Sequence, residues 1–235
     1  MGNKCSTPPQ LYARPAAGPA IAPNDAEAAT LASLASRFPA LHARDVEGPE
    51  LLAAPAQLTD SVFLGSFEHA RDKDWLATHS IAAILNCGPD VCRHSAEQVP
   101  RDARTQLVEQ GSNAERRVAR ARAFYGESVE YAECDATDVE GYAILDKHLN
   151  DAVAFIGRQK GPVLIHCFSG QNRSAALALG YLMTERGLSM EQALALAHPL
   201  RPLILSNESF RLQLLRLEAK HVCKGEPVLS QRSTH

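Results

Sequence analysis

The residues best suited to chemistry lie in VLIHCFSGQNRSAALALGYLM, residues 163–183. An apolar run places Cys167 at the end of a predicted strand, and a predicted helix begins near Arg173. In open α/β sheets, ligands bind at the carboxyl ends of strands. The tight loop from Cys167 to Arg173, with Gly170 in its middle, can turn its backbone amides inward as an anion-binding nest. We therefore expect this loop to hold a phosphate-sized dianion.

The same arrangement favours the charged form of Cys167. The helix amino terminus, the inward amides and Arg173 all stabilise negative charge, so we expect a thiolate at neutral pH. Arg173 is expected to grip two phosphoryl oxygens as a planar fork. The Ser174 hydroxyl can donate a hydrogen bond to the sulfur and ease its later departure. The segment therefore predicts nucleophilic attack by Cys167 on phosphorus.

An acidic loop offers a proton donor for this chemistry. The sequence ECDATD contains Asp135 and Asp138 directly after a predicted strand. Expelling a serine, threonine or tyrosine oxygen from phosphorus is costly without a general acid, and a loop can close over bound substrate. Either aspartate can instead cap a turn or the helix predicted in GYAILDKHL. On these residues alone, both remain candidates.

The motif HCFSGQNRS resembles the HCxxGxxRS signature of cysteine-dependent dual-specificity protein phosphatases in the protein tyrosine phosphatase superfamily. The resemblance covers residues 58 to about 218 and includes SVFLGS, IAAILN, VLIHC and RPLILSNESFRLQLLRLE. It implies a phosphoric monoester hydrolase that removes phosphate from phosphotyrosine and from phosphoserine or phosphothreonine in proteins. The reaction implied passes through a phosphocysteine intermediate and uses no cofactor and no metal.

The resemblance also assigns roles by position. Cys167 matches the nucleophile, Arg173 the phosphate-binding arginine, and Ser174 the hydroxyl that assists breakdown of the intermediate. His166 matches the residue that orients the loop and tunes the thiolate. The family usually places its acid seven residues after an aromatic of the preceding strand, and the spacing from Tyr131 to Asp138 favours Asp138 over Asp135.

The loop from Cys167 to Arg173 is called the phosphate cradle below. The resemblance implies that substrate is bound by Arg173 together with backbone amides of Phe168, Ser169, Gly170, Gln171 and Asn172. Lipid-phosphate members of the wider superfamily tend to carry lysines in this loop, and the loop here has none. A phosphoprotein is therefore favoured over a polyphosphoinositide.

From about Leu58, short apolar runs alternate with helical periodicity, which indicates an α/β domain. The resemblance implies a central, mainly parallel sheet of four or five strands flanked by helices. We expect a catalytic domain at residues 56–222, a polar insertion at about 89–126 and a tail at 223–235. The insertion arginines predict either a solvated helix or an anionic docking surface; they are Arg116, Arg117, Arg120 and Arg122.

Several helices follow from local patterns. FEHARDKDWLATHS predicts one helix, SMEQALALAHPL begins with a capping-box pair at Ser189 and Gln192, and SNESFRLQLLRLEAK predicts a basic amphipathic helix. Residues 1–55 are rich in alanine and proline and are expected to form a flexible arm. Within this arm, NDAEAATLASLASRF allows a short helix.

The first six residues, MGNKCS, match the N-myristoylation pattern with Gly2 as acceptor. Cys5 beside it can take a palmitoyl chain. One myristoyl chain holds a protein to a membrane only weakly, so two chains make the attachment stable. The sequence therefore predicts a cytoplasmic protein with membrane association through N-terminal acylation.

Composition limits the classes of partner and function that the protein can have. A formal net charge of −3 argues against a general nucleic-acid partner, and the 6 cysteines show no paired framework. We expect phosphoproteins, including protein kinases, as partners. The alternatives are the same chemistry on a lipid, sugar or RNA-end phosphate, and a phosphate-binding adaptor without turnover. An adaptor has no need of the nucleophile, which argues against that class.

Overall fold

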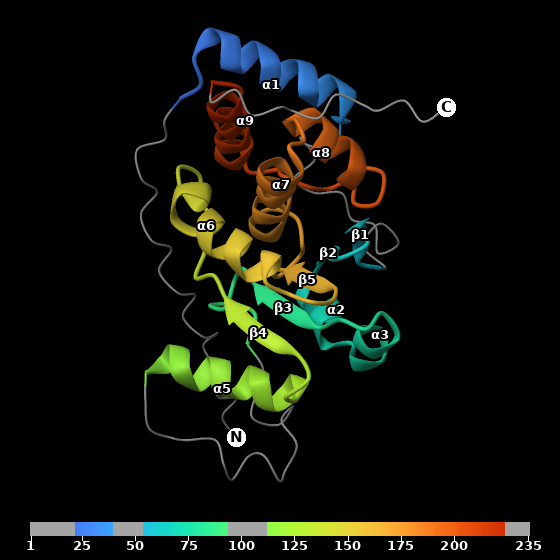
Figure 1. Ribbon diagram of the computed structural model, residues 1–235. Helices are drawn as coiled ribbons and strands as arrows, with labels where there is room; N and C mark the ends of the chain where they lie inside the picture. The colour runs from blue at the N-terminus through green and yellow to red at the C-terminus, as the bar shows by residue number, and fades with distance from the viewer. Residues whose placement is uncertain (1–21, 40–53, 94–111, 224–235) are drawn as a thin grey trace, which may run out of the picture.

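The computed structural model describes residues 22–39, 54–93 and 112–223. A five-stranded sheet in the order β1-β2-β5-β3-β4 forms the centre of this part of the chain (Figure 1). β1 pairs antiparallel with β2, and the other pairs are parallel, which is the mainly parallel sheet that the sequence predicts. The strands are β1 (Ala56–Thr59), β2 (Val62–Gly65), β3 (Ala83–Asn86), β4 (Glu130–Glu133) and β5 (Val163–His166).

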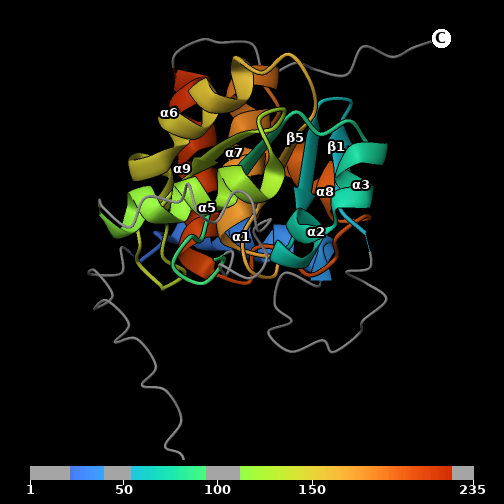
Figure 2. The same ribbon diagram turned by 90° about the horizontal axis from the view of Figure 1, so that it is seen from below.

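Helices cover both faces of the sheet. They are α1 (Asp25–Arg37), α2 (Phe67–Arg71), α3 (Lys73–Thr78), α5 (Asn113–Tyr125), α6 (Ile144–Gly157), α7 (Arg173–Arg186), α8 (Met190–Ala197) and α9 (Glu208–Cys223). Side chains alternate across a strand, so Ile165 packs in the core formed with α6 to α9 and Leu164 packs in the core formed with α2, α3 and α5. Figures 1 and 2 show α5 on the side of β4 away from α7.

The central strand β5 determines where the site lies. It is buried along its whole length, and its parallel register pairs His166 with Gly65 of β2 and with Asn86 of β3. The loops that follow these three strands therefore leave the same edge of the sheet. Helix α7 begins at Arg173 and is buried from there to Met183, so its amino terminus is fixed at this edge.

Two local predictions differ from the structure. The single helix expected in FEHARDKDWLATHS is divided into α2 and α3, because the Asp72 side chain accepts the Trp75 N–H at 2.9 Å and starts a new helix. Asp competes with helical hydrogen bonds in this way. Strand β1 was not predicted. The capping box at Ser189 and Gln192 is present.

The insertion contributes a packed helix. Ala121 of α5 is buried against the β4 side of the sheet, and Arg117 forms a 3.1 Å ion pair with Glu133. Arg120 and Arg122 lie on the exposed face. Helix α5 is therefore amphipathic and is anchored by Arg117 rather than solvated on all sides. No described helix is long and apolar enough to cross a membrane.

Residues 22–39 of the expected flexible arm are folded onto the domain. Helix α1 packs on α9 (Figure 1). Arg216 of α9 holds the Glu27 carboxylate of α1 through Nε at 2.8 Å and Nη2 at 2.9 Å. Leu34 of α1 is buried, and Arg37 pairs with Glu191 of α8. The short helix that the sequence allowed here is confirmed as α1. The expectation of a flexible arm was wrong for this part, because α1 has an apolar stripe and charged partners on the domain.

The Glu27–Arg216 contact gives a testable account of how α1 is held. Hydrogen bonds from Arg216 and from the Asn24 backbone lower the pKa of Glu27 from 4.5 to about 2. The ion pair's stabilisation of the folded protein is fully present above pH 4.5 and is lost as the pH falls through about 2. We expect Glu27→Gln to speed amide hydrogen exchange in α1 at neutral pH, measured by mass spectrometry. Glu68→Gln, which removes an exposed pair with Arg71, should leave α1 unchanged; equal effects would contradict this account.

Candidate active site

Cys167 directly follows β5, and α7 begins six residues later, at the edge of the sheet described above. The Ser174 hydroxyl donates a hydrogen bond to Cys167 Sγ at 3.2 Å. Both residues are buried, Cys167 at 1% exposure. A hydroxyl donor at this distance stabilises sulfur as an anion and as a leaving group. The structure therefore brings together the candidate nucleophile and the candidate hydroxyl predicted from the sequence.

The carbonyl groups of the phosphate cradle are held by partners outside it. The carbonyl of Phe168 accepts the Phe67 N–H at 3.0 Å, and that of Gln171 accepts the Leu205 N–H at 2.8 Å. The carbonyl of Ser169 accepts Arg201 Nη2 at 2.9 Å. In a trans peptide the N–H points opposite to the carbonyl. The amides that follow these carbonyls, those of residues 169, 170 and 172, therefore face the inner side of the loop.

Gly170 is required at the turn of the cradle. Its φ is +75°, and a Cβ there would lie 2.4 Å from the carbonyl oxygen of Gly65. Only glycine takes both this conformation and this approach without strain. β2 therefore packs directly against the loop, which fixes its curvature.

Arg201 supports the cradle from beneath and had no role in the sequence analysis beyond the resemblance of its segment. It is completely buried, and its Nη1 donates to the carbonyl of Ala54 at 3.2 Å. Burial lowers its pKa to about 10. Leu205 nearby has a φ of 56°, uncommon for a residue with a side chain. These features make the loop before α9 a structural support of the cradle.

Arg173 approaches the loop that follows β3. Its Nη1 donates to Asp90 Oδ1 at 3.2 Å and to the carbonyl of Ala136 at 3.5 Å. Gly88 allows this approach, since a Cβ there would meet Nη1 at 2.5 Å. Within the described residues, the buried Nε of Arg173 has no hydrogen-bond partner. It is therefore available to an anion bound in the cradle.

The charge of Arg173 is secured by its surroundings. Burial would lower its pKa, but Cys167, Asp138 and Asp90 raise it above the ordinary value. The sequence did not predict that Asp90 lies at the site in contact with Arg173. The Asp90 side chain is 49% exposed, and the residue lies in the polar insertion where the only signal was its place after a buried strand.

The structure distinguishes the two acid candidates by position. Asp138 is half-buried and accepts the Asn172 amide of the cradle at 3.1 Å. Asp135 is exposed, and its described contact is a backbone carbonyl that accepts the Tyr142 hydroxyl at 3.2 Å. The geometry therefore brings Asp138 to the cradle and leaves Asp135 outside it. Tyr131, used in the spacing argument, hydrogen-bonds Asn86 and Glu133.

His166 directly precedes the candidate nucleophile Cys167. It is fully buried, its Nδ1 is 3.3 Å from the Cys167 carbonyl oxygen, and its ring stacks on Phe67 with centroids 6.0 Å apart. This packing fixes the peptide that carries Cys167. Phe168, by contrast, is 61% exposed. Its ring can contact a substrate, whereas its backbone belongs to the cradle.

Two other buried thiols lie near Cys167. Burial raises the pKa of Cys87 well above its usual value, and the neighbouring Cys134 and Cys167 raise it further. Burial also raises the pKa of Cys92. These two are therefore neutral thiols that pack in the core. The acylation candidates Gly2 and Cys5 lie outside the described residues.

Comparison with known proteins shows the family to which this fold belongs. The family profile described as dual specificity phosphatase, catalytic domain, matches residues 62–220. The chain belongs to this family of the protein tyrosine phosphatase superfamily.

Curated relatives are similar at low identity. The chain is 29% identical over 176 residues to MAP kinase phosphatase with leucine-rich repeats protein 3 of Dictyostelium discoideum, covering 72% of this chain and 16% of that protein. It is 27% identical over 167 residues to human dual specificity protein phosphatase 21, covering 70% and 72%. The chain thus spans a small part of some relatives and most of others.

Solved structures show the same fold. Human DUSP28 matches with a TM-score of 0.52 and 23% identity, covering 76% of this chain and 98% of that one. A mouse putative dual specificity phosphatase matches with a TM-score of 0.54 and 20% identity, covering 78% and 96%. At these identities the likeness concerns the fold.

Gly170→Ala should disturb both stability and activity. The left-handed φ alone costs about 1–3 kcal/mol, and the clash with Gly65 displaces the cradle. Thermal unfolding and phosphate-ester hydrolysis measure the two effects. Gly157→Ala is the matched control, because a Cβ there meets nothing within 4 Å. A fully active, equally stable Gly170→Ala protein would show that the cradle does not depend on this glycine.

Asp90→Asn should tighten the binding of inorganic phosphate. Asparagine keeps an oxygen that accepts from Arg173 but removes a negative charge that repels the dianion. A half-exposed ion pair is worth at most about 1 kcal/mol, so the inhibition constant of phosphate should fall by up to about fivefold. Asp146→Asn on α6 makes the same charge change away from the cradle. An equal shift in both variants would assign the effect to net charge.

Proposed function

We propose that the protein is a dual-specificity protein phosphatase that acts through a phosphocysteine intermediate. The observation that carries this proposal is the meeting of Cys167, Ser174 and Arg173 at one loop end, with Asp138 hydrogen-bonded to the same loop. Nucleophile, leaving-group stabiliser, anion receptor and acid are the parts that phosphate-ester cleavage requires.

In the first step, the Cys167 thiolate attacks phosphorus while the substrate phosphate is held by inward amides and by Arg173. The sulfur–phosphorus bond forms as the bond from phosphorus to the ester oxygen breaks. Protonated Asp138 gives its proton to the leaving oxygen of the tyrosine, serine or threonine. The dephosphorylated protein leaves, and the phosphoryl group remains on sulfur.

In the second step, water attacks the phosphorus of the phosphocysteine. Asp138, now a carboxylate, takes a proton from this water, and the sulfur–phosphorus bond breaks. The Ser174 hydroxyl, 3.2 Å from Sγ, stabilises the departing thiolate. Inorganic phosphate is released and both Cys167 and Asp138 return to their starting states.

Protein substrates are favoured over other phosphate esters. The cradle contains no lysine to pair with a polyphosphoinositide headgroup, and the exposed Phe168 offers an apolar contact to a peptide side chain. One similar protein bears the name MAP kinase phosphatase, which supports phosphorylated kinases as the substrate class. We further propose a cytoplasmic location with membrane association through acylation of Gly2 and Cys5.

Hydrolysis of phenyl phosphate in the presence of a metal chelator tests the mechanism. We expect Cys167→Ser to abolish turnover, because the hydroxyl is a far weaker nucleophile. Asp138→Ala should lower kcat by about 100-fold or more, and Asp135→Ala should keep nearly full activity. Loss of activity in Asp135→Ala instead of Asp138→Ala would move the acid to Asp135.

The substrate class is tested with phosphotyrosine, phosphothreonine and phosphoserine peptides against phosphoinositide and RNA-end phosphates. Faster turnover of phosphoinositide or RNA ends would replace the proposed substrate class. Tight phosphopeptide binding without turnover by the wild-type protein would favour an adaptor.

A further inference from the structure

The Asp138 side chain is held at both oxygens by amide groups from two separate segments. Asn172 Nδ2 donates to Oδ2 at 3.1 Å, and Asn207 Nδ2 donates to Oδ1 at 3.1 Å. Asn172 belongs to the cradle, and Asn207 directly precedes α9. We refer to these two residues as the amide clamp.

The orientation of each clamp amide follows from backbone donors. The oxygen of Asn172 accepts the Asn207 N–H at 3.1 Å, and the oxygen of Asn207 accepts the Phe210 N–H at 3.3 Å. A backbone N–H can only donate, so each amide must turn its oxygen to it. The NH₂ groups are thereby left facing Asp138. The backbone N–H groups at the start of α9 thus orient the clamp so that its NH₂ groups can donate hydrogen bonds to the Asp138 carboxyl group.

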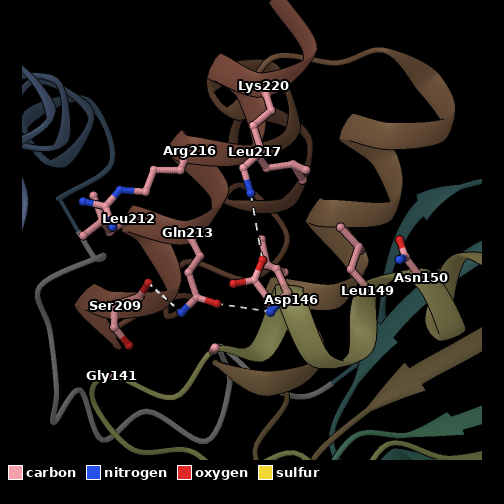
Figure 3. A pocket seen from close by; sticks show the side chains of 12 residues that line it. Gly141, Asp146, Leu149, Asn150, Ser209, Leu212, Gln213, Arg216, Leu217 and Lys220 are labelled. Atoms are coloured by element: carbon pink, nitrogen blue, oxygen red, sulfur yellow. Dashed lines mark hydrogen bonds and ion pairs between the residues drawn. The ribbon is translucent and has the colours of Figure 1, made fainter. Parts of the chain in front are cut away.

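The acid loop, residues 134–143, is fixed to α9 at further points. Glu140 accepts the backbone N–H groups of Glu208 at 3.1 Å and Ser209 at 3.0 Å. Gln213 donates to the Tyr142 carbonyl at 2.8 Å and accepts the Leu145 N–H at 3.1 Å. Figure 3 shows Gln213 pointing from α9 toward the start of α6, beside a cavity of about 290 Å³. The loop is therefore held in place without substrate.

We propose that Asn207 is a positioning residue for catalysis, acting with Asn172 to hold the Asp138 carboxyl beside the cradle before substrate arrives. Each carboxyl oxygen that accepts one amide hydrogen keeps a further site for the proton that is transferred. Catalytic geometry fixed in advance removes an ordering cost from the chemical step. This inference rests on the proposed function, since it concerns the acid of that reaction.

The effect of a misplaced acid depends on the leaving group, whereas a general structural defect does not. p-Nitrophenolate leaves as a stable anion and needs little protonation, but phenolate and serine alkoxide need a proton. Loss of acid positioning should therefore slow phenyl phosphate far more than p-nitrophenyl phosphate. The ratio of the rates on phenyl phosphate and p-nitrophenyl phosphate therefore distinguishes loss of acid positioning from a general structural defect.

The variant that tests the inference is Asn207→Ser. Serine keeps an oxygen that can cap α9 at the Phe210 N–H but has no amide to reach Asp138. We expect kcat for phenyl phosphate to fall about tenfold or more, with kcat for p-nitrophenyl phosphate within about threefold of wild type. KM for both esters should change little, because the cradle is untouched.

Ser209→Ala is the matched control. Its hydroxyl donates to the Asn207 oxygen at 2.7 Å, on the side away from Asp138. It perturbs the same helix start but leaves the clamp donors in place. Both rates should remain near wild type, and thermal unfolding of the two variants should show that each is folded.

A double variant completes the test. If Asn207 acts through Asp138, adding Asn207→Ser to Asp138→Ala should cause no further loss on phenyl phosphate. Additive losses, or equal losses on both esters in the single variant, would overturn the inference while the wild-type enzyme remains active. An inactive wild type would overturn the proposed function and the inference together.

Discussion

The site depends on the outward fixing of the carbonyl groups in the phosphate cradle. An empty ring of inward amides is electrostatically unfavourable, because parallel N–H dipoles repel one another. The fold offsets this cost with the Phe67 and Leu205 amides and the Arg201 guanidinium, which hold the carbonyls from behind. Substrate therefore meets a loop that is already shaped, and little reorganisation accompanies binding.

This constraint explains why remote segments matter to the site. The loop from Arg201 to Asn207 supplies a cradle support at one end and an acid contact at the other. It also adopts a left-handed conformation at Leu205, which is held by complete burial of that side chain. The phosphate cradle and the loop that carries Asp138 are therefore both held by this single segment, and α9 keeps the segment in place against residues 134–143.

The sequence allowed strands β2 to β5, the start of α7 and the loop after Cys167 to be predicted, because apolar runs and loop spacing are local signals. The mainly parallel sheet was implied by the family resemblance. The residues that the prediction missed act through contacts distant in sequence. Asp90 meets Arg173 83 residues away, and Arg201 reaches Ala54 across 147 residues. Neither contact produces a periodic pattern in the amino-acid sequence. The docking of α1 was missed for the same reason, since Glu27 and Arg216 are 189 residues apart.

The contact between Arg201 and Ala54 bears on where the folded catalytic domain begins. Ala54 precedes β1 and lies before the family match at residues 62–220. A chain shortened to the matched region loses this acceptor for a wholly buried guanidinium, and it loses β1 and α1 as well. Residues before the family match, Ala54 among them, thus contribute contacts to the catalytic fold. A domain boundary set at the start of the match excludes these contacts.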